Sequence, residues 1–169
     1  MERSFGSVFL STFFLVGAAS AQAPSVNHLI PPKNEEAKRE SARDVAVLEQ
    51  TIDRVGRAFE EGSPEELDSL LSDQKIHLSL KARGEEAGYY GRSQVKFIFA
   101  RLFRERKTDS FTYDPREIEV SGEKSAQFRA KWNYMVLDAD EVVTEHLRFE
   151  LERGARGIWR ISEIRTQAR

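Results

Sequence analysis

Residues 58–67 read AFEEGSPEEL, and this stretch contains the end of one helix and the start of another. Gly62 is typical of the position just after a helix, where glycine adopts the left-handed conformation without steric cost. Ser63 at the N-cap, Pro64 at the first helical position and Glu66 at the third form a capping box. The sequence therefore predicts two helices that meet at a tight corner.

Apolar side chains recur at helical spacing on both sides of this corner and again further along the chain. Ser41 is the expected N-cap of the first helix, and Ser93 is expected to begin the third. Arg101, Arg104, Arg106 and Lys107 close the third helix, and we interpret them as a solvated helix end. The apolar stripes are Val45, Leu48, Ile52, Val55 and Phe59; then Leu67, Leu70 and Leu71; then Val95, Ile98, Phe99, Leu102 and Phe103.

Alternating apolar and polar residues dominate the rest of the chain, and this period is typical of strands with one buried face. Residues 83–91 contain three glycines and are expected to form a loop. Short connections favour antiparallel pairing, so the order of elements predicts an α+β fold with helices on one face of the sheet. The expected strands are 76–80, 111–113, 118–120, 126–136, 143–151 and 158–164.

This order of elements resembles the nuclear transport factor 2-like superfamily, also called SnoaL-like or ketosteroid-isomerase-like. The resemblance rests on residues 58–67, on Tyr89-Tyr90-Gly91-Arg92-Ser93 before the third helix, and on the closing Ile158-Trp159-Arg160-Ile161. It covers about 45–168 and implies a cystatin-like α+β cone, a curved antiparallel sheet packed against three N-terminal helices. It implies no single chemistry, since the superfamily includes isomerases, dehydratases, hydrolases, transport adaptors and binding modules.

The first 21 residues are typical of an export signal. Arg3 precedes an apolar run from Val8 to Val16 that is too short for a permanent membrane span, and Ala19-Ser20-Ala21 fits the pattern before a signal-peptidase cut. A short buried helix is the alternative. We expect a periplasmic or secreted protein with no membrane span after cleavage. Its parts would be a cleaved signal at 1–21, a flexible tether at 22–40 and the folded domain at 41–169.

Composition excludes several classes of function. The chain has 169 residues, with 26 Lys and Arg against 28 Asp and Glu, and a formal net charge of −2. So small a charge does not attract nucleic acid, and none is expected as a partner. The chain has no cysteine, which excludes disulfides, thiolate metal ligands and a cysteine nucleophile.

The histidines do not form a metal-binding pattern. His28 lies in the expected tether, and His77 and His146 lie on separate strands, without an H-x-H or H-x-x-x-H pair. Strand alternation places His77 and His146 on the solvent side of the sheet, opposite the apolar side chains. We therefore expect no metal, no cofactor and no Ser/His/acid triad.

Glu145 is the charged residue on the otherwise apolar face of strand 143–151. One strand register places Tyr134 opposite Glu145, and the register shifted by two residues places Trp132 there. In either case an acid and an aromatic ring share the concave face, where burial favours a protonated carboxyl that could act in acid–base chemistry. Alternatively, Glu145 lies at the mouth of the cone and stays solvated.

The resemblance implies that ligands occupy the cavity between the sheet and the helices. Aromatic residues on an inner face are also ordinary core residues, and no position matches the isomerase motif, so the resemblance transfers no catalytic role. The side chains that could line such a cavity are Tyr90, Tyr113, Trp132, Tyr134 and Glu145.

These observations favour an exported, non-catalytic domain that binds a small apolar ligand or a protein partner. The alternative is an isomerase-, dehydratase- or hydrolase-type enzyme that uses Glu145 as general acid–base, with Tyr134 or Tyr113 as hydrogen-bond donor. A third possibility is a structural accessory in an envelope assembly, anchored by the tether. Met135, Leu137 and Val142 make the outer face of the sheet more apolar than solvation requires, which predicts a homodimer through that face.

Overall fold

The structure is a computed structural model, and its described residues are 33–84, 87–139 and 141–167. Contacts divide the chain into Met1–Pro32 and Lys33–Arg169, and all described residues belong to the second unit. The expected export signal and the first part of the expected tether lie outside the described residues.

The helix corner forms as the sequence predicts. Helix α1 spans Lys33–Glu60 and helix α2 spans Pro64–Leu70. Between them Gly62 has a positive φ of 60°, and the Ser63 hydroxyl accepts a hydrogen bond of 3.2 Å from the Glu66 amide. The cap satisfies one of the free amides at the start of α2 and fixes the angle at which the chain turns.

Helix α1 begins earlier than expected. Its first residue is Lys33 rather than the residue after Ser41, so positions 33–40 continue the helix. These positions read KNEEAKRE, in which Glu, Ala, Lys and Arg are strong helix formers. The polar composition that suggested a tether is thus also compatible with a helix, and the structure has a helix at these positions.

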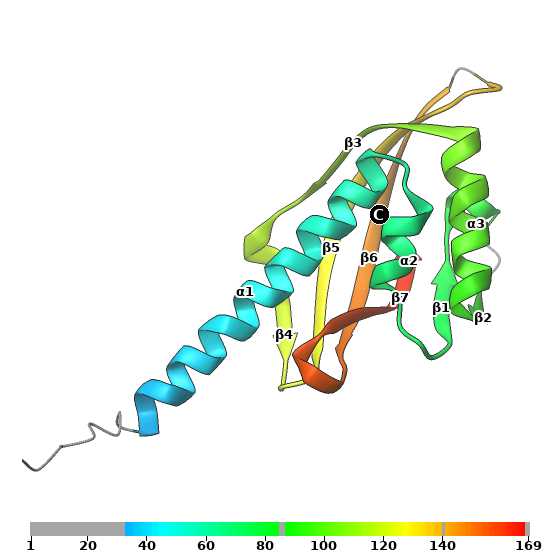
Figure 1. The fold of residues 1–169 in the computed structure, drawn as a ribbon. Coiled ribbons are helices and arrows are strands. Elements are labelled where there is room, and N and C mark those ends of the chain that lie inside the picture. The colour runs from blue at the N-terminus through cyan, green and yellow to red at the C-terminus, as the bar shows by residue number, and fades with distance from the viewer. Residues whose placement is uncertain (1–32, 85–86, 140, 168–169) are drawn as a thin grey trace, which may run out of the picture. The chain divides into compact units, whose positions relative to one another are not determined.

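Within the described part of the chain, seven strands form one sheet in the order β2-β1-β7-β6-β5-β3, with β4 paired to β5 (Figure 1). Helix α3, Arg92–Glu105, lies between β2 and β3 in the chain. The strands are β1 Ile76–Ser79, β2 Gly88–Tyr90, β3 Arg106–Tyr113, β4 Glu119–Ser121, β5 Ser125–Val136, β6 Glu141–Arg153 and β7 Trp159–Thr166.

Three details of the sheet differ from the prediction. Strands β1 and β7 pair in parallel, so the sheet is mixed rather than wholly antiparallel. Residues 88–90, expected in a loop, form β2 and pair antiparallel with β1. Arg106 and Lys107, expected to close the third helix, begin β3. In each case, pairing with a neighbouring strand of the sheet outweighs the local conformational preference of the residues.

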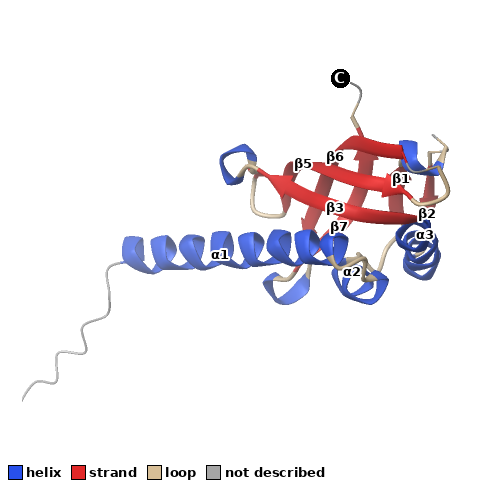
Figure 2. Cartoon of the chain, turned by 90° about the horizontal axis from the view of Figure 1, so that it is seen from above, coloured by secondary structure: helices blue, strands red, loops and turns tan. Residues whose placement is uncertain are grey.

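The inner and outer faces of the sheet are those that the alternation predicts. Ala126, Phe128, Ala130, Trp132 and Tyr134 of β5 are buried, as are Glu145, Leu147, Phe149 and Leu151 of β6. Figure 2 shows the helices on one side of the sheet.

The ring of Phe59, near the end of α1, is the centre of the core. Its centroid lies 4.7 Å from that of Phe111 and 5.2 Å from that of Trp132. Phe99 and Phe103 of α3 lie 5.5 Å away, and Phe149 of β6 lies 5.8 Å away. One ring therefore connects two helices and three strands.

Replacing Phe59 with alanine should lower the free energy of unfolding by about 3–5 kcal/mol, because it leaves a cavity among these rings. Urea denaturation followed by circular dichroism measures the change. Phe97→Ala is the matched control, since Phe97 is 74% exposed, and it should change stability by less than about 0.5 kcal/mol. Equal losses in the two variants would contradict the central position of Phe59.

Candidate functional site

Glu145 and Trp132 are opposite each other in the pairing of β5 with β6, while Tyr134 is opposite Val143. The second of the two registers considered above is therefore correct. Alternation brings all three of Trp132, Tyr134 and Glu145 to the inner face, and the centroids of the Trp132 and Tyr134 rings lie 4.2 Å apart.

The Glu145 carboxylate is buried and is surrounded by donors. Its side chain is 2% exposed, so the expectation that it stays solvated is wrong. The Lys81 amide donates to Oε1 at 3.0 Å and the Tyr134 hydroxyl donates to Oε2 at 3.3 Å. The Thr166 hydroxyl also donates to Oε1, and it accepts a bond of 2.8 Å from the same Lys81 amide. The carboxylate thus holds together β5, β6, the end of β7 and the turn at Lys81.

Tyr134 is held in its protonated form. Burial and then the charge of Glu145 raise the pKa of this phenol to about 12, against an opposing effect of Arg106. At neutral pH its hydroxyl therefore donates to the carboxylate. The Arg106 guanidinium carbon lies 5.8 Å from the centroid of the Tyr134 ring.

Trp132 and Tyr113 form hydrogen bonds with residues other than Glu145. The Trp132 indole donates to the Thr108 hydroxyl at 3.0 Å, and its side chain is inaccessible to solvent. Tyr113, at the other end of β3 from Arg106, donates to Asp53 of α1 at 2.5 Å. Burial and then that hydrogen bond raise the pKa of Tyr113 to about 12. The structure therefore brings Trp132, Tyr134 and Glu145 together, but not Tyr113.

A groove of about 900 Å³ lies between α3, residues 81–84 and Tyr90, outside the aromatic core. Its walls include Tyr90, Phe97, Ile98 and Leu102. Tyr90 is the one of the five predicted lining residues that faces this groove, and the guanidinium of Arg83 lies 4.4 Å from its ring centroid. The groove and the buried acid are thus two different places.

Helix α3 is held in position at its first turn. The Arg92 guanidinium donates to Asp68 of α2 at 2.9 Å and to Asp73 at 3.0 Å. These bonds join the start of α3 to the end of α2, and so fix one wall of the groove relative to the sheet.

Lys81 and Arg106 connect the groove to the buried acid. Both line the groove, yet the Lys81 amide bonds Glu145 and the Arg106 guanidinium lies beside Tyr134. Arg106 also donates to the Ala82 carbonyl at 2.6 Å and to Glu105 at 3.2 Å, and its side chain is 14% exposed. The interpretation of Arg106 as part of a solvated helix end is therefore wrong.

Sequence reasoning missed Phe97, Lys81 and Arg106 as groove residues. Phe97 carried a usable signal, because it is an aromatic residue outside the apolar stripe of its helix. Lys81 and Arg106 carried none, because their positions depend on how a turn and a strand pack against β6.

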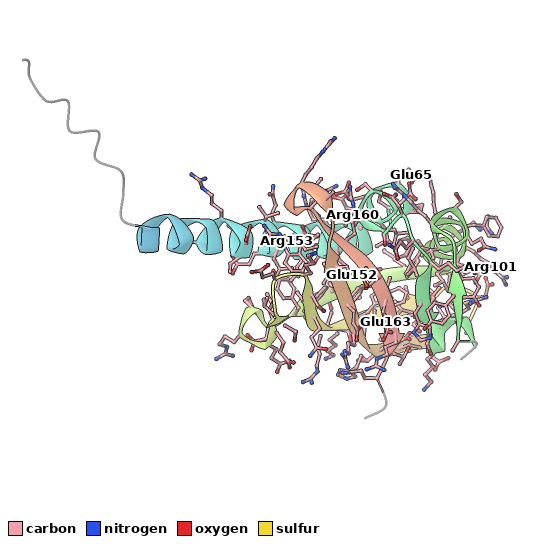
Figure 3. The ribbon with its side chains drawn as sticks, turned by 90° about the horizontal axis from the view of Figure 1, so that it is seen from below. Glu65, Arg101, Glu152, Arg153, Arg160 and Glu163 are labelled. Carbon is pink, nitrogen blue, oxygen red and sulfur yellow. The ribbon has the colours of Figure 1, made fainter. Side chains whose placement is uncertain are left out.

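His77 and His146 lie on the outer face as expected. His77 Nδ1 is 3.1 Å from Oε2 of Glu163, a β7 residue labelled in Figure 3. Over the described ranges no group of three or more His, Asp or Glu side chains is placed to hold a metal ion. His28 lies outside those ranges. None of the described helices is both long and apolar enough to span a membrane.

Comparison with known proteins identifies the fold. No family model matches the chain, and no curated protein matches it. Among solved structures, the chain is similar to a ketosteroid isomerase-like protein from Erwinia carotovora atroseptica, with a TM-score of 0.59, 18% identity and coverage of 73% of this chain and 94% of that one. It is also similar to an NTF2-like protein with a cystatin-like fold from Novosphingobium aromaticivorans, with a TM-score of 0.58, 16% identity and coverage of 82% and 90%.

A DUF4783 family protein from Bacteroides ovatus is a third similar structure, with a TM-score of 0.54, 16% identity and coverage of 66% of this chain and 89% of that one. At such identities these likenesses show the fold alone. The chain has the α+β nuclear transport factor 2-like fold, with a curved, unclosed sheet and three helices, and the predicted resemblance is confirmed at that level.

Replacing Glu145 with leucine should lower the free energy of unfolding by about 1–3 kcal/mol, because the buried Tyr134 hydroxyl loses its acceptor and the Lys81 amide keeps only the Thr166 hydroxyl. Glu145→Gln keeps an oxygen for Lys81 and should cost less. Glu141→Leu, at an exposed position of the same strand, is the control. Chemical denaturation of the three variants tests the order, and a loss for Glu141→Leu as large as for Glu145→Leu would contradict the role of the buried carboxylate.

Proposed function

We propose that this protein is an exported, non-catalytic binding domain. Its ligand, a small apolar molecule or an apolar segment of a protein partner, would occupy the groove between α3, residues 81–84 and Tyr90. The proposal rests on the difference between the surroundings of Glu145 and those of the groove. The buried pair of Glu145 and Tyr134 is satisfied by the chain itself, while the groove is open and is lined in part by apolar side chains.

The geometry around Glu145 argues against acid–base chemistry. A general acid or base must come within hydrogen-bonding reach of the atom whose proton it transfers. Glu145 is 2% exposed and Tyr134 is 3% exposed, and the space between sheet and helices next to them contains the rings of Phe59, Trp132 and Phe103. Opening this site to a substrate would require the core to separate.

The groove has the properties of a binding site. Its volume of about 900 Å³ falls in the range that small-molecule sites occupy. Phe97 is 74% exposed on its wall, and Ile98 and Leu102 also line the groove. An exposed aromatic residue beside a concave apolar surface gains free energy when a ligand covers it.

The enzyme alternative retains one supporting observation, which is the contact between Glu145 and Tyr134. An acid beside a protonated phenol is a pairing that can stabilise an enolate or transfer a proton. Neither group lines the groove. A substrate could reach them only through a separate opening in the structure, so we favour the binding function.

Binding of the uncharged fluorescent probe N-phenyl-1-naphthylamine tests the groove. Phe97→Ser should weaken binding of the probe by about ten-fold, because the ligand loses the contact area of one aromatic ring. Tyr89→Ser is the matched control, since Tyr89 is 70% exposed on neighbouring β2 but does not line the groove. Equal affinity of the two variants would show that the probe binds elsewhere and would overturn the proposal.

Export is the second part of the proposal and rests on residues 1–21. When the full chain is expressed in a bacterium with a periplasm, the mature protein should be recovered there with Gln22 as its first residue, as measured by mass spectrometry. Ala21→Arg places a large charged side chain before the cut and should leave the signal attached. Recovery of an uncleaved wild-type chain from the cytoplasm would refute this part alone.

The homodimer is also retained as a proposal. Leu137 is 50% exposed and Val142 is 73% exposed, and Met135 is half-buried on the same hairpin. These side chains support pairing because a second copy would remove their apolar area from water.

A further inference from the structure

The charged side chains that line the groove are mostly positive, in a chain that is acidic overall. Among the described residues, these side chains are Lys81, Arg83, Arg101, Arg106 and Glu105. Four of these five are positive, whereas the whole chain has a net charge of −2. A concave surface of one sign concentrates the field and attracts the opposite charge.

Glu105 neutralises only part of this charge, because two guanidinium groups share it. Arg101 Nε donates to Oε1 at 2.7 Å, and Arg106 Nη1 donates to Oε2 at 3.2 Å. The hydrogen bond from Arg101 lowers the pKa of Glu105 from its ordinary value. Arg106 is mostly buried, and within the described residues its Nε has no hydrogen-bond partner. A second anion near this pair would be favoured, since a partly desolvated guanidinium needs more than a shared counter-charge.

Apolar and cationic side chains of the groove lie next to each other along α3. Phe97 and Ile98 come about one turn before Arg101, with about 5.4 Å for each turn, and Leu102 directly follows Arg101. Arg106 follows at the start of β3. Figure 3 shows Arg101 on α3, at the end of the molecule away from the free end of α1. A single ligand in the groove can therefore contact apolar and cationic side chains together.

We propose that the groove binds a single-chain amphiphilic anion, of the kind of a medium-chain carboxylate. Its anionic group lies against Arg101 and Arg106, and its chain covers Ile98 and Phe97. This inference rests on the proposed binding function of the groove and specifies the ligand. An uncharged chain would leave the two guanidinium groups with one shared carboxylate, and a cationic chain would be repelled.

Calorimetric titration with decanoate, 1-decanol and decylamine, all below their micelle-forming concentrations, tests the proposal. Decanoate should bind about ten-fold more tightly than decanol in low salt. Added salt should reduce this difference in affinity, because it screens the charges. In Arg101→Gln the preference for decanoate should fall to about three-fold or less, while the affinity for decanol is unchanged. Arg104→Gln, at an exposed position of the same helix outside the groove, should keep the full preference.

The outcomes separate this inference from the proposed function. Equal affinity for decanoate and decanol, or tighter binding of decylamine, would overturn the charge preference and leave the groove as a binding site. A preference that survives Arg101→Gln would overturn the placement of the anion. Binding to phosphatidylglycerol vesicles without binding to dispersed decanoate would replace a free ligand by a membrane surface and overturn the proposal. If neither the naphthylamine probe nor any decyl compound binds, both proposals fail.

Discussion

A buried carboxylate joins the end of the sheet to the wall of the groove. Glu145 accepts hydrogen bonds from Tyr134 on β5, from Thr166 on β7 and from the Lys81 amide. A carboxylate away from water is tolerated only where donors surround it, so these segments must stay together. Since Lys81 begins the short helix Lys81–Arg83 beside the groove, the interaction that satisfies Glu145 also fixes one side of the groove.

The same inner face excludes a ligand from the interior. The resemblance implied a cavity between sheet and helices, but here that space contains the ring of Phe59 with Phe99, Phe103, Phe111 and Phe149 around it. Close packing of this kind stabilises the fold because it removes a large aromatic area from water. A binding surface would therefore have to lie elsewhere, and the groove between α3, residues 81–84 and Tyr90 is the one we propose.

The sequence predicted what depends on neighbours along the chain. The corner at Gly62 and Ser63, the stripe of α3 and the alternation of β5 and β6 all follow from local chemistry, and the structure has them. It did not predict the parallel pairing of β1 with β7 or the strand at Arg106, since both depend on segments far away in sequence. Glu145 could be predicted because it is a charged residue on an apolar strand face. Its donors Lys81 and Thr166 could not be predicted, because only the pairing of the sheet brings them close to it.

Phe97 shows why a binding surface is harder to predict from a sequence than a core. Core residues recur at the helical period, so a core position can be predicted from its neighbours in the sequence. Phe97 lies outside the apolar stripe of α3 and, because it is 74% exposed, contributes little to folding. An exposed ring beside a groove gains free energy when apolar area is removed from water, and the ligand we propose would cover it. Under the same proposal Arg101 and Arg106 favour an anionic ligand, because the carboxylate they share leaves positive charge for a ligand to neutralise.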